Sequence, residues 1–207
     1  MHSKFVAHPW HGIAAGEQAP DVVNTFIQIV PTDTVKYEID KVSGFLKVDR
    51  PQKFSNFYPS LYGFIPQTYC GDEVKTLAQE HSPGYKIEKG DGDPLDICVL
   101  SEKIFHHGYL ILKSIPIGGI RLIDKGEADD KIISVLVGDE IYGKYQDIVE
   151  LPEGVVNRLK HYFLTYKNIP GETKNVCEIS GIYGRDIAHE VIKRSQLDYN
   201  NNYNKIQ

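Results

Sequence analysis

Residues 90–100 read GDGDPLDICVL and join three closely spaced carboxylates to an apolar segment. The apolar part, residues 96–100, predicts a buried β-strand. Carboxylates at Asp91, Asp93 and Asp96 would repel one another beside a core unless a cation neutralised them. Magnesium prefers such carboxylate oxygens and often completes its shell with substrate phosphates. The stretch therefore predicts a strand that begins at a metal site, with a solvated acidic turn as the alternative.

A calcium-binding EF-hand loop is a competing interpretation of the same residues. Asp91, Asp93 and Glu102 match its first, third and twelfth positions. Its sixth position needs glycine for a sharp turn, and here that position is Asp96. The residues that follow also favour a strand over a helix. This mismatch disfavours the calcium module.

Short β-rich segments surround this stretch on both sides. The strand candidates are residues 25–30, 35–39, 45–48, 96–100, 109–115, 120–123 and 131–137. Turns are expected at Gly118-Gly119 and Lys125-Gly126. Strands in such close succession indicate a small closed sheet or barrel, not alternating strand and helix units.

Helical periodicity is concentrated late in the chain. Apolar residues recur at helical spacing after Pro152, and again after Arg185-Asp186, so two main C-terminal helices are expected. The fold class is therefore α+β and mainly β. We expect a single domain over residues 1–207, with an N-terminal arm (1–23), a polar surface excursion (71–90) and a frayed tail (198–207).

Composition excludes several classes of protein. The 207 residues carry 23 basic and 28 acidic side chains, a formal net charge of −5, which disfavours a general nucleic-acid binder. Three cysteines without a CxxC pair exclude a disulfide scaffold and a thiolate zinc site. No apolar run reaches transmembrane length and no signal peptide is visible, so we expect a cytoplasmic protein without membrane contact.

Two further groups of residues can complete a phosphate site. A second acidic cluster spans Asp124 to Lys131 between two strand candidates, and beside the first cluster it can supply a multi-metal centre. Arg50 suits bidentate contact with phosphate oxygens, and Lys36 and Lys167 suit point-charge contact. Each of these cations alone would be read as a solvated surface charge.

At this point the chain resembles the soluble family I inorganic pyrophosphatases. The resemblance covers roughly residues 24–193, and its motifs occur in the family's order: VKYEID, VDRP, FYPSLYGFIP, DGDPLD, the D-x4-D-x-K pattern from Asp124 to Lys131, and HYFLTYK. The HPWHG segment and the DRPQKFSNF stretch are similar to a bacterial branch with an added N-terminal arm and a longer loop before DGDPLD. The resemblance implies an oligonucleotide-binding (OB)-like β-barrel with helices packed outside. It also implies hydrolysis of pyrophosphate to two orthophosphates with several Mg²⁺ ions, in a homo-oligomer, with a hexamer favoured.

Family membership also implies a role for each matching residue. The metal-binding set is Asp91, Asp96, Asp129, Asp124 and Glu38. The catalytic pair is Asp93, as the general base, and Tyr62, near the nucleophile or the product phosphate, with Tyr58 as a weaker candidate for the same wall. The phosphate-binding set is Lys36, Arg50, Lys131, Tyr166 and Lys167.

Two positions depart from the family pattern. Many relatives carry Glu where this chain has Gln28, and an acid where it has Lys125. These departures bear on the number and affinity of metals and leave the chemistry intact. A non-catalytic barrel that binds a phosphate-bearing ligand is the alternative function. It is disfavoured because Asp91, Asp93 and Asp96 are all present, as are Asp124, Asp129 and Lys131.

Overall fold

The computed structural model describes residues 7–168 and 177–203, which form a mainly β structure with three α-helices. The strands are β1 (Val23–Ile29), β2 (Val35–Ile39), β3 (Leu46–Pro51), β4 (Leu61–Phe64), β5 (Lys89–Gly90), β6 (Asp96–Leu100), β7 (Leu110–Asp124), β8 (Glu127–Leu136) and β9 (Cys177–Gly184). The helices are α1 (Asp72–His81), α2 (Glu153–Thr165) and α3 (Arg185–Tyr203), with a 3-10 turn at Ile148–Glu150.

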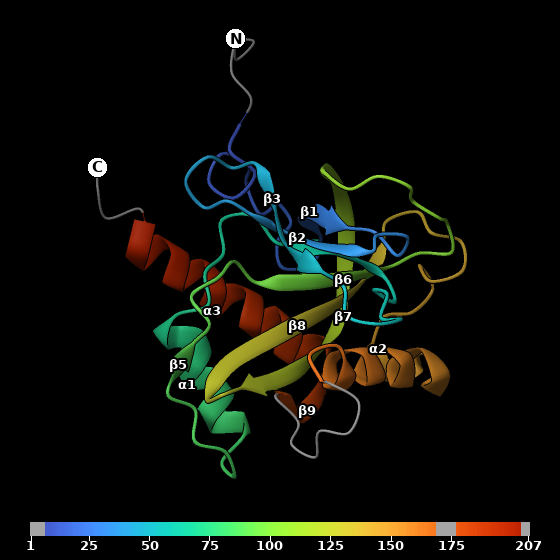
Figure 1. Cartoon of the computed structure of the whole chain (residues 1–207). Coiled ribbons are helices and arrows are strands. Elements are labelled where there is room, and N and C mark those ends of the chain that lie inside the picture. Colours follow the sequence, from blue (N-terminus) through green and yellow to red (C-terminus); the bar gives the residue numbers. More distant parts are fainter. Residues whose placement is uncertain (1–6, 169–176, 204–207) are drawn as a thin grey trace.

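Five strands close into a ring in the order β1, β4, β6, β8 and β7 (Figure 1). All neighbours are antiparallel except β6 and β8, which are parallel. The β7–β8 pairing closes the ring, and β9 extends it along the other edge of β7. The predicted closed barrel is confirmed. The β2–β3 hairpin forms a separate two-stranded sheet.

The β7–β8 hairpin is longer than the sequence suggested. Its turn at Lys125-Gly126 is confirmed, and both residues have positive φ (52° and 87°), as a tight hairpin turn requires. The turn expected at Gly118-Gly119 is wrong, because both glycines lie inside the continuous strand β7. A Cβ on Gly119 would overlap the Tyr183 ring on β9. These glycines therefore allow close packing at a bulged crossing of strands.

The two C-terminal helices begin where the sequence predicted, at Glu153 and Arg185. Helix α2 buries Leu159 and Phe163 in the cluster that holds one face of the barrel strands. Helix α3 buries Val191 in the cluster on the other face. Figure 1 shows α2 and α3 on different sides of the barrel. None of the described helices is both long enough and apolar enough to cross a bilayer.

Two segments expected to be irregular are helical. The segment 71–90, expected as a polar surface excursion, contains the helix α1, which buries Val74, Leu77 and Ala78. The tail expected to fray from residue 198 continues α3 to Tyr203, while residues 204–207 lie outside the described part. One residue explains both findings. The Asp198 carboxylate, which is buried, accepts backbone N–H bonds from Gly71, Glu73 and Val74 and so caps α1.

Candidate active site

A cavity lies where the β2–β3 hairpin faces the starts of β6 and β8, the end of β7 and the C-terminal end of α2. Its lining contains eleven of the twelve residues predicted for the site, and the missing one is Glu38. The lining residues are Lys36, Arg50, Tyr58, Tyr62, Asp91, Asp93, Asp96, Asp124, Glu127, Asp129, Lys131, Phe163, Tyr166 and Lys167.

Strand register explains how carboxylates separated by over thirty positions meet. Asp96 on β6 is the register partner of Lys131 on β8. Since side chains alternate across a sheet, Asp129 and Lys131 share one face of β8 while Asp130 lies on the other. Asp130 accordingly pairs with Arg121 on the far face, where both side chains are buried. The two faces of β8 thus separate a structural ion pair from the cavity.

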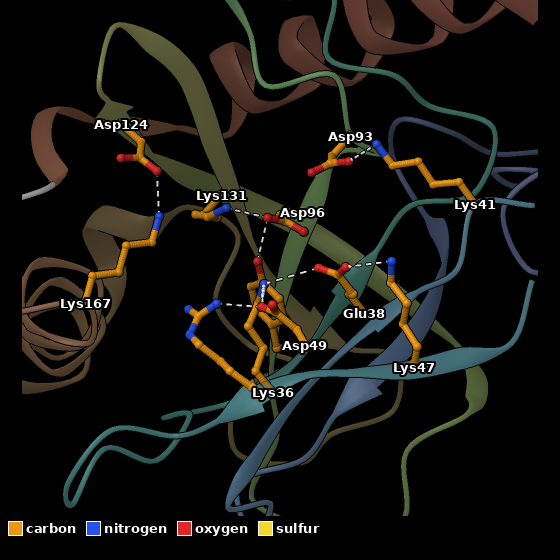
Figure 2. A network of polar contacts seen from close by, with 12 residues as sticks. Lys36, Glu38, Lys41, Lys47, Asp49, Asp93, Asp96, Asp124, Lys131 and Lys167 are labelled. Atoms are coloured by element: carbon orange, nitrogen blue, oxygen red, sulfur yellow. Dashed lines mark hydrogen bonds and ion pairs between the residues drawn. The ribbon is translucent and has the colours of Figure 1, made fainter.

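Lys131 lines the cavity, and Figure 2 shows its side chain reaching toward Asp96. Its side chain is 4% exposed, and its ammonium contacts both the Asp96 and the Asp129 carboxylates. Burial opposes ionisation of Asp129, but the Lys131 ammonium holds the pKa of that carboxyl below its usual value. Burial raises the pKa of Asp96, against the opposite effect of Lys131, and the Tyr62 hydroxyl donates to its Oδ2 at 2.5 Å.

A second charged pair lies at the end of β7 (Figure 2). Lys167, just after α2, donates to Asp124 Oδ2 at 2.6 Å. The other carboxylate oxygen of Asp124 is buried and has no hydrogen-bond partner among the residues that the structure describes. Tyr166 packs beside this pair, and burial raises its pKa to about 12, so its hydroxyl is protonated at neutral pH. The free oxygen of Asp124 can bind a cation, and the Tyr166 hydroxyl and Lys167 ammonium beside it can donate to an anion that this cation also contacts.

The β2–β3 hairpin adds two cations to the cavity. Lys36 and Arg50 are register partners on adjacent strands. The Asp49 carboxylate accepts from both, at 2.7 Å from Lys36 Nζ and 2.5 Å from the Arg50 guanidinium. Asp49 therefore holds the Lys36 ammonium and the Arg50 guanidinium next to each other at the edge of the cavity.

Glu38 does not line this cavity but an adjoining pocket, which it shares with Asp96. It pairs with Lys47 at 3.1 Å and with Lys36 at 3.7 Å, and it lines an adjoining pocket that also contains Gln28. Asp93 borders both cavities and pairs with Lys41 (Figure 2). Asp96 and Tyr62 also line both pockets, so Glu38 shares its pocket with one of the buried carboxylates.

The charged side chains that line the cavity indicate whether metal ions could bind there. Six carboxylates and four Lys or Arg side chains line it, which leaves an excess of negative charge. Burial also raises the pKa of the Asp91 carboxyl well above its usual range. In the described part of the chain no three acidic, His or Cys side chains converge as a finished metal site, and the Lys131 ammonium lies between Asp96 and Asp129. Carboxylate oxygens are the ligands that hard divalent cations prefer, so the donor set of this cavity fits such ions.

Some residues in the cavity, and Asp49 beside it, had no role in the sequence prediction. Glu127 lies within the second acidic cluster, and that clustering was its available signal. Asp49 precedes Arg50 in the VDRP motif, so its position was a signal too. Phe163 belongs to the apolar periodicity of α2 and is indistinguishable in sequence from an ordinary core residue. Lys125, the family departure, is exposed in the hairpin turn and does not line the cavity.

An OB-like barrel with a buried carboxylate cluster and a rim of Lys, Arg and Tyr defines a class of metal-dependent phosphate-handling enzymes. A family model described as inorganic pyrophosphatase matches residues 25–200. The inorganic pyrophosphatase of Chlamydia muridarum is 49% identical over 200 residues, which cover 95% of each chain. Soluble inorganic pyrophosphatase 1 of Arabidopsis thaliana is 38% identical, over 91% of this chain and 78% of the relative. The crystal structure of the Thermus thermophilus inorganic pyrophosphatase superposes with a TM-score of 0.76 at 30% identity, over 93% of this chain and 99% of that one. The chain therefore belongs to the inorganic pyrophosphatase family.

Proposed function

We propose that this protein hydrolyses inorganic pyrophosphate to two orthophosphates in the cavity described above. One observation carries the proposal: buried carboxylates and a ring of phosphate-binding donors line a single cavity on a pyrophosphatase fold. Pyrophosphate is a compact, highly charged anion. Its binding therefore needs both metal ions and fixed cations, and this cavity contains ligands for the first and a full set of the second.

We propose Mg²⁺ as the metal, with several ions in each site. The residues that would hold it are Asp91, Asp96 and Asp129, with Asp124 joining Asp129 for an ion that enters with substrate and Glu38 contributing from the adjoining pocket. Bound Mg²⁺ would neutralise phosphate charge and lower the pKa of a coordinated water. The buried Asp124 oxygen, which has no hydrogen-bond partner in the described part of the chain, supports its place in this set.

The chain's own residues then divide the remaining work. Asp93 accepts a proton from the attacking water, since its half-exposed carboxylate borders both cavities. Tyr62 donates a hydrogen bond that orients Asp96. Five side chains hold the phosphates in line and offset the charge on the leaving phosphate: Lys36, Arg50, Lys131, Tyr166 and Lys167.

The first experiment measures phosphate release from pyrophosphate with Mg²⁺. The native chain should turn over rapidly, and Asp93→Asn should lose on the order of 10²–10⁴-fold in kcat, the usual contribution of a positioned general base. Asp186→Asn, a substitution in the first turn of α3, is the matched control and should retain activity. Full activity in Asp93→Asn would place the base elsewhere. A native chain that binds pyrophosphate without turnover would support the non-catalytic barrel.

We also propose that residues 1–207 form one domain and that the protein is a cytoplasmic homo-oligomer, with the hexamer as the preferred state. The family's bacterial members suggest the assembly, and three free, buried cysteines suit a reducing compartment. Analytical ultracentrifugation measures the assembly directly. A monomer at micromolar concentration would contradict it.

A further inference from the structure

Lys41 forms an ion pair with Asp93, the proposed general base, and has no role in the function proposed so far. It follows the β2 strand and lies outside every motif role given above. Its ammonium pairs with the Asp93 carboxylate and also donates to the Gly92 carbonyl at 3.0 Å. Figure 2 shows Lys41 reaching Asp93 from the side opposite to Lys131. One side chain thus binds two successive residues of the DGDPLD loop.

The backbone of Asp93 is fixed by other groups, but its side chain is not. The Asp93 N–H donates to Asp91 Oδ1 at 3.0 Å, and its carbonyl accepts from the Cys70 N–H at 2.9 Å. Gly92 adopts a left-handed φ of 73°, which turns the chain between the two carboxylates. Among the described residues, Lys41 alone makes a direct hydrogen bond or ion pair with the Asp93 carboxylate. The orientation of that carboxylate therefore depends on Lys41.

Lys41 in turn rests on the N-terminal arm. Its ammonium lies 6.0 Å from the centre of the Trp10 ring, and Trp10 is 1% exposed. The Trp10 indole N–H donates to the Thr68 carbonyl at 2.8 Å. Thr68 Oγ1 accepts from the Leu95 N–H at 2.9 Å, inside the same DGDPLD loop. Trp10 of the arm is therefore linked to the DGDPLD loop in two ways. It binds Thr68, which binds Leu95, and it lies beside Lys41, which pairs with Asp93.

We propose that Lys41 is a positioning residue for Asp93, held in place by Trp10 of the N-terminal arm. The proposal rests on the proposed function, since it gives the arm and Lys41 a part in the same reaction. Both side chains of the pair are about half exposed, at 51% and 53%, and exposed ion pairs contribute little to stability. The value of this contact therefore lies in orienting the carboxylate toward the attacking water.

Steady-state kinetics on three variants tests the proposal. Lys41→Met keeps the aliphatic stem and removes the charge, and kcat should fall about tenfold with KM for pyrophosphate within about twofold, as expected when a reacting group is misplaced. Lys41→Arg should recover most of the loss. Lys103→Met removes an exposed lysine outside the cavity that also forms an ion pair, with Glu102 at 2.9 Å, and it should behave as the native enzyme.

A double-mutant cycle separates positioning from a general structural role. If Lys41 acts through Asp93, Lys41→Met should have no further effect on kcat in the Asp93→Asn background. The melting temperature should stay within about 2 °C of the native value, as for other exposed pairs. Trp10 is the one tryptophan of the chain, so its emission should also shift in Lys41→Met.

Three results would each overturn the proposal: additive losses in the cycle, an unchanged kcat in Lys41→Met, or no recovery in Lys41→Arg. None of them would contradict the proposed pyrophosphatase function. Absence of phosphate release from the native chain would instead remove the proposed function and this inference together.

Discussion

Tyr62 shows how a single hydroxyl can matter more for activity than for stability. Its ring is buried against Tyr58 and Phe163, and its O–H donates to the Asp96 carboxylate. Tyr62→Phe keeps the packed ring and removes only this charged hydrogen bond, worth about 1.5–3 kcal/mol. We expect kcat with Mg²⁺ to fall about 10–100-fold in a phosphate-release assay, because Asp96 loses its orientation.

Tyr183→Phe is the matched control for this prediction. Tyr183 is also buried and its hydroxyl donates to a carboxylate, Asp130 Oδ1, at 2.7 Å, on the face of β8 away from the cavity. The control should lower the urea midpoint and leave kcat near the native value. Equal loss of activity in both variants would show that Tyr62 acts only through the fold.

At the scale of residues, the motifs named side chains that the fold brings to one cavity, and their catalytic and metal-binding roles stay predictions. Asp96 and Lys131 meet because β6 and β8 run parallel in one register, and both positions belonged to recognisable motifs. Glu38 was predicted with the other ligands, and it shares with Asp96 a pocket that adjoins the main cavity; local alternation on a hairpin does not indicate which of the two pockets a side chain lines. Lys41 was missed because its role depends on contacts with a loop fifty residues away. Tertiary contacts of this kind leave no local pattern.

At the scale of elements, α1 depends on a carboxylate supplied by another helix. Asp198 of α3 accepts from three N–H groups at the start of α1 and is 3% exposed. Asp198→Ala leaves these donors buried and unpaired, so the free energy of unfolding should fall by about 2–3 kcal/mol. Asp186→Ala, in the first turn of α3, should cost no more than about 1 kcal/mol. Urea denaturation compares the two, and equal losses would contradict the cap.

The glycines of β7 and β9 give a second test at this scale. Gly119→Ala places a methyl group into the Tyr183 ring, and overpacking of this kind costs about 1–3 kcal/mol. Gly181 lies on β9 with open space around its Cα, so Gly181→Ala should be neutral or slightly stabilising. Thermal unfolding should rank the variants in that order. A stable Gly119→Ala would mean that the crossing of β7 and β9 can relax.

Strands and turns were predicted correctly where the local sequence signals agree. Predictions were wrong where tertiary packing determines the local structure. The strands Val35–Ile39 and Asp96–Leu100 match their predicted bounds, and the Lys125-Gly126 turn matches its residues. Gly118-Gly119 reads as a turn in sequence, but tertiary packing against Tyr183 uses the same glycines inside a strand. The polar segment 71–90 has too weak an apolar face to indicate a helix alone. Its stability comes from α3, which no local pattern reveals.

At the scale of the whole molecule, the excess of carboxylates in the cavity links folding to divalent cations. Ions that bind only the folded chain stabilise it by about 2.7 kcal/mol at a hundred times their Kd, which for a chain of this size raises the melting temperature by roughly 5–10 °C. We expect that rise with Mg²⁺ in a chelator-treated sample, measured by calorimetry without substrate. KCl at equal ionic strength should give a much smaller rise, since general screening does not require a site. Asp129→Asn should lose most of the Mg²⁺ effect, because it removes a carboxylate that pairs with Lys131 in the cavity. Equal shifts with KCl and Mg²⁺ would mean that the cavity's negative charge is merely screened and that its carboxylates do not form a metal site.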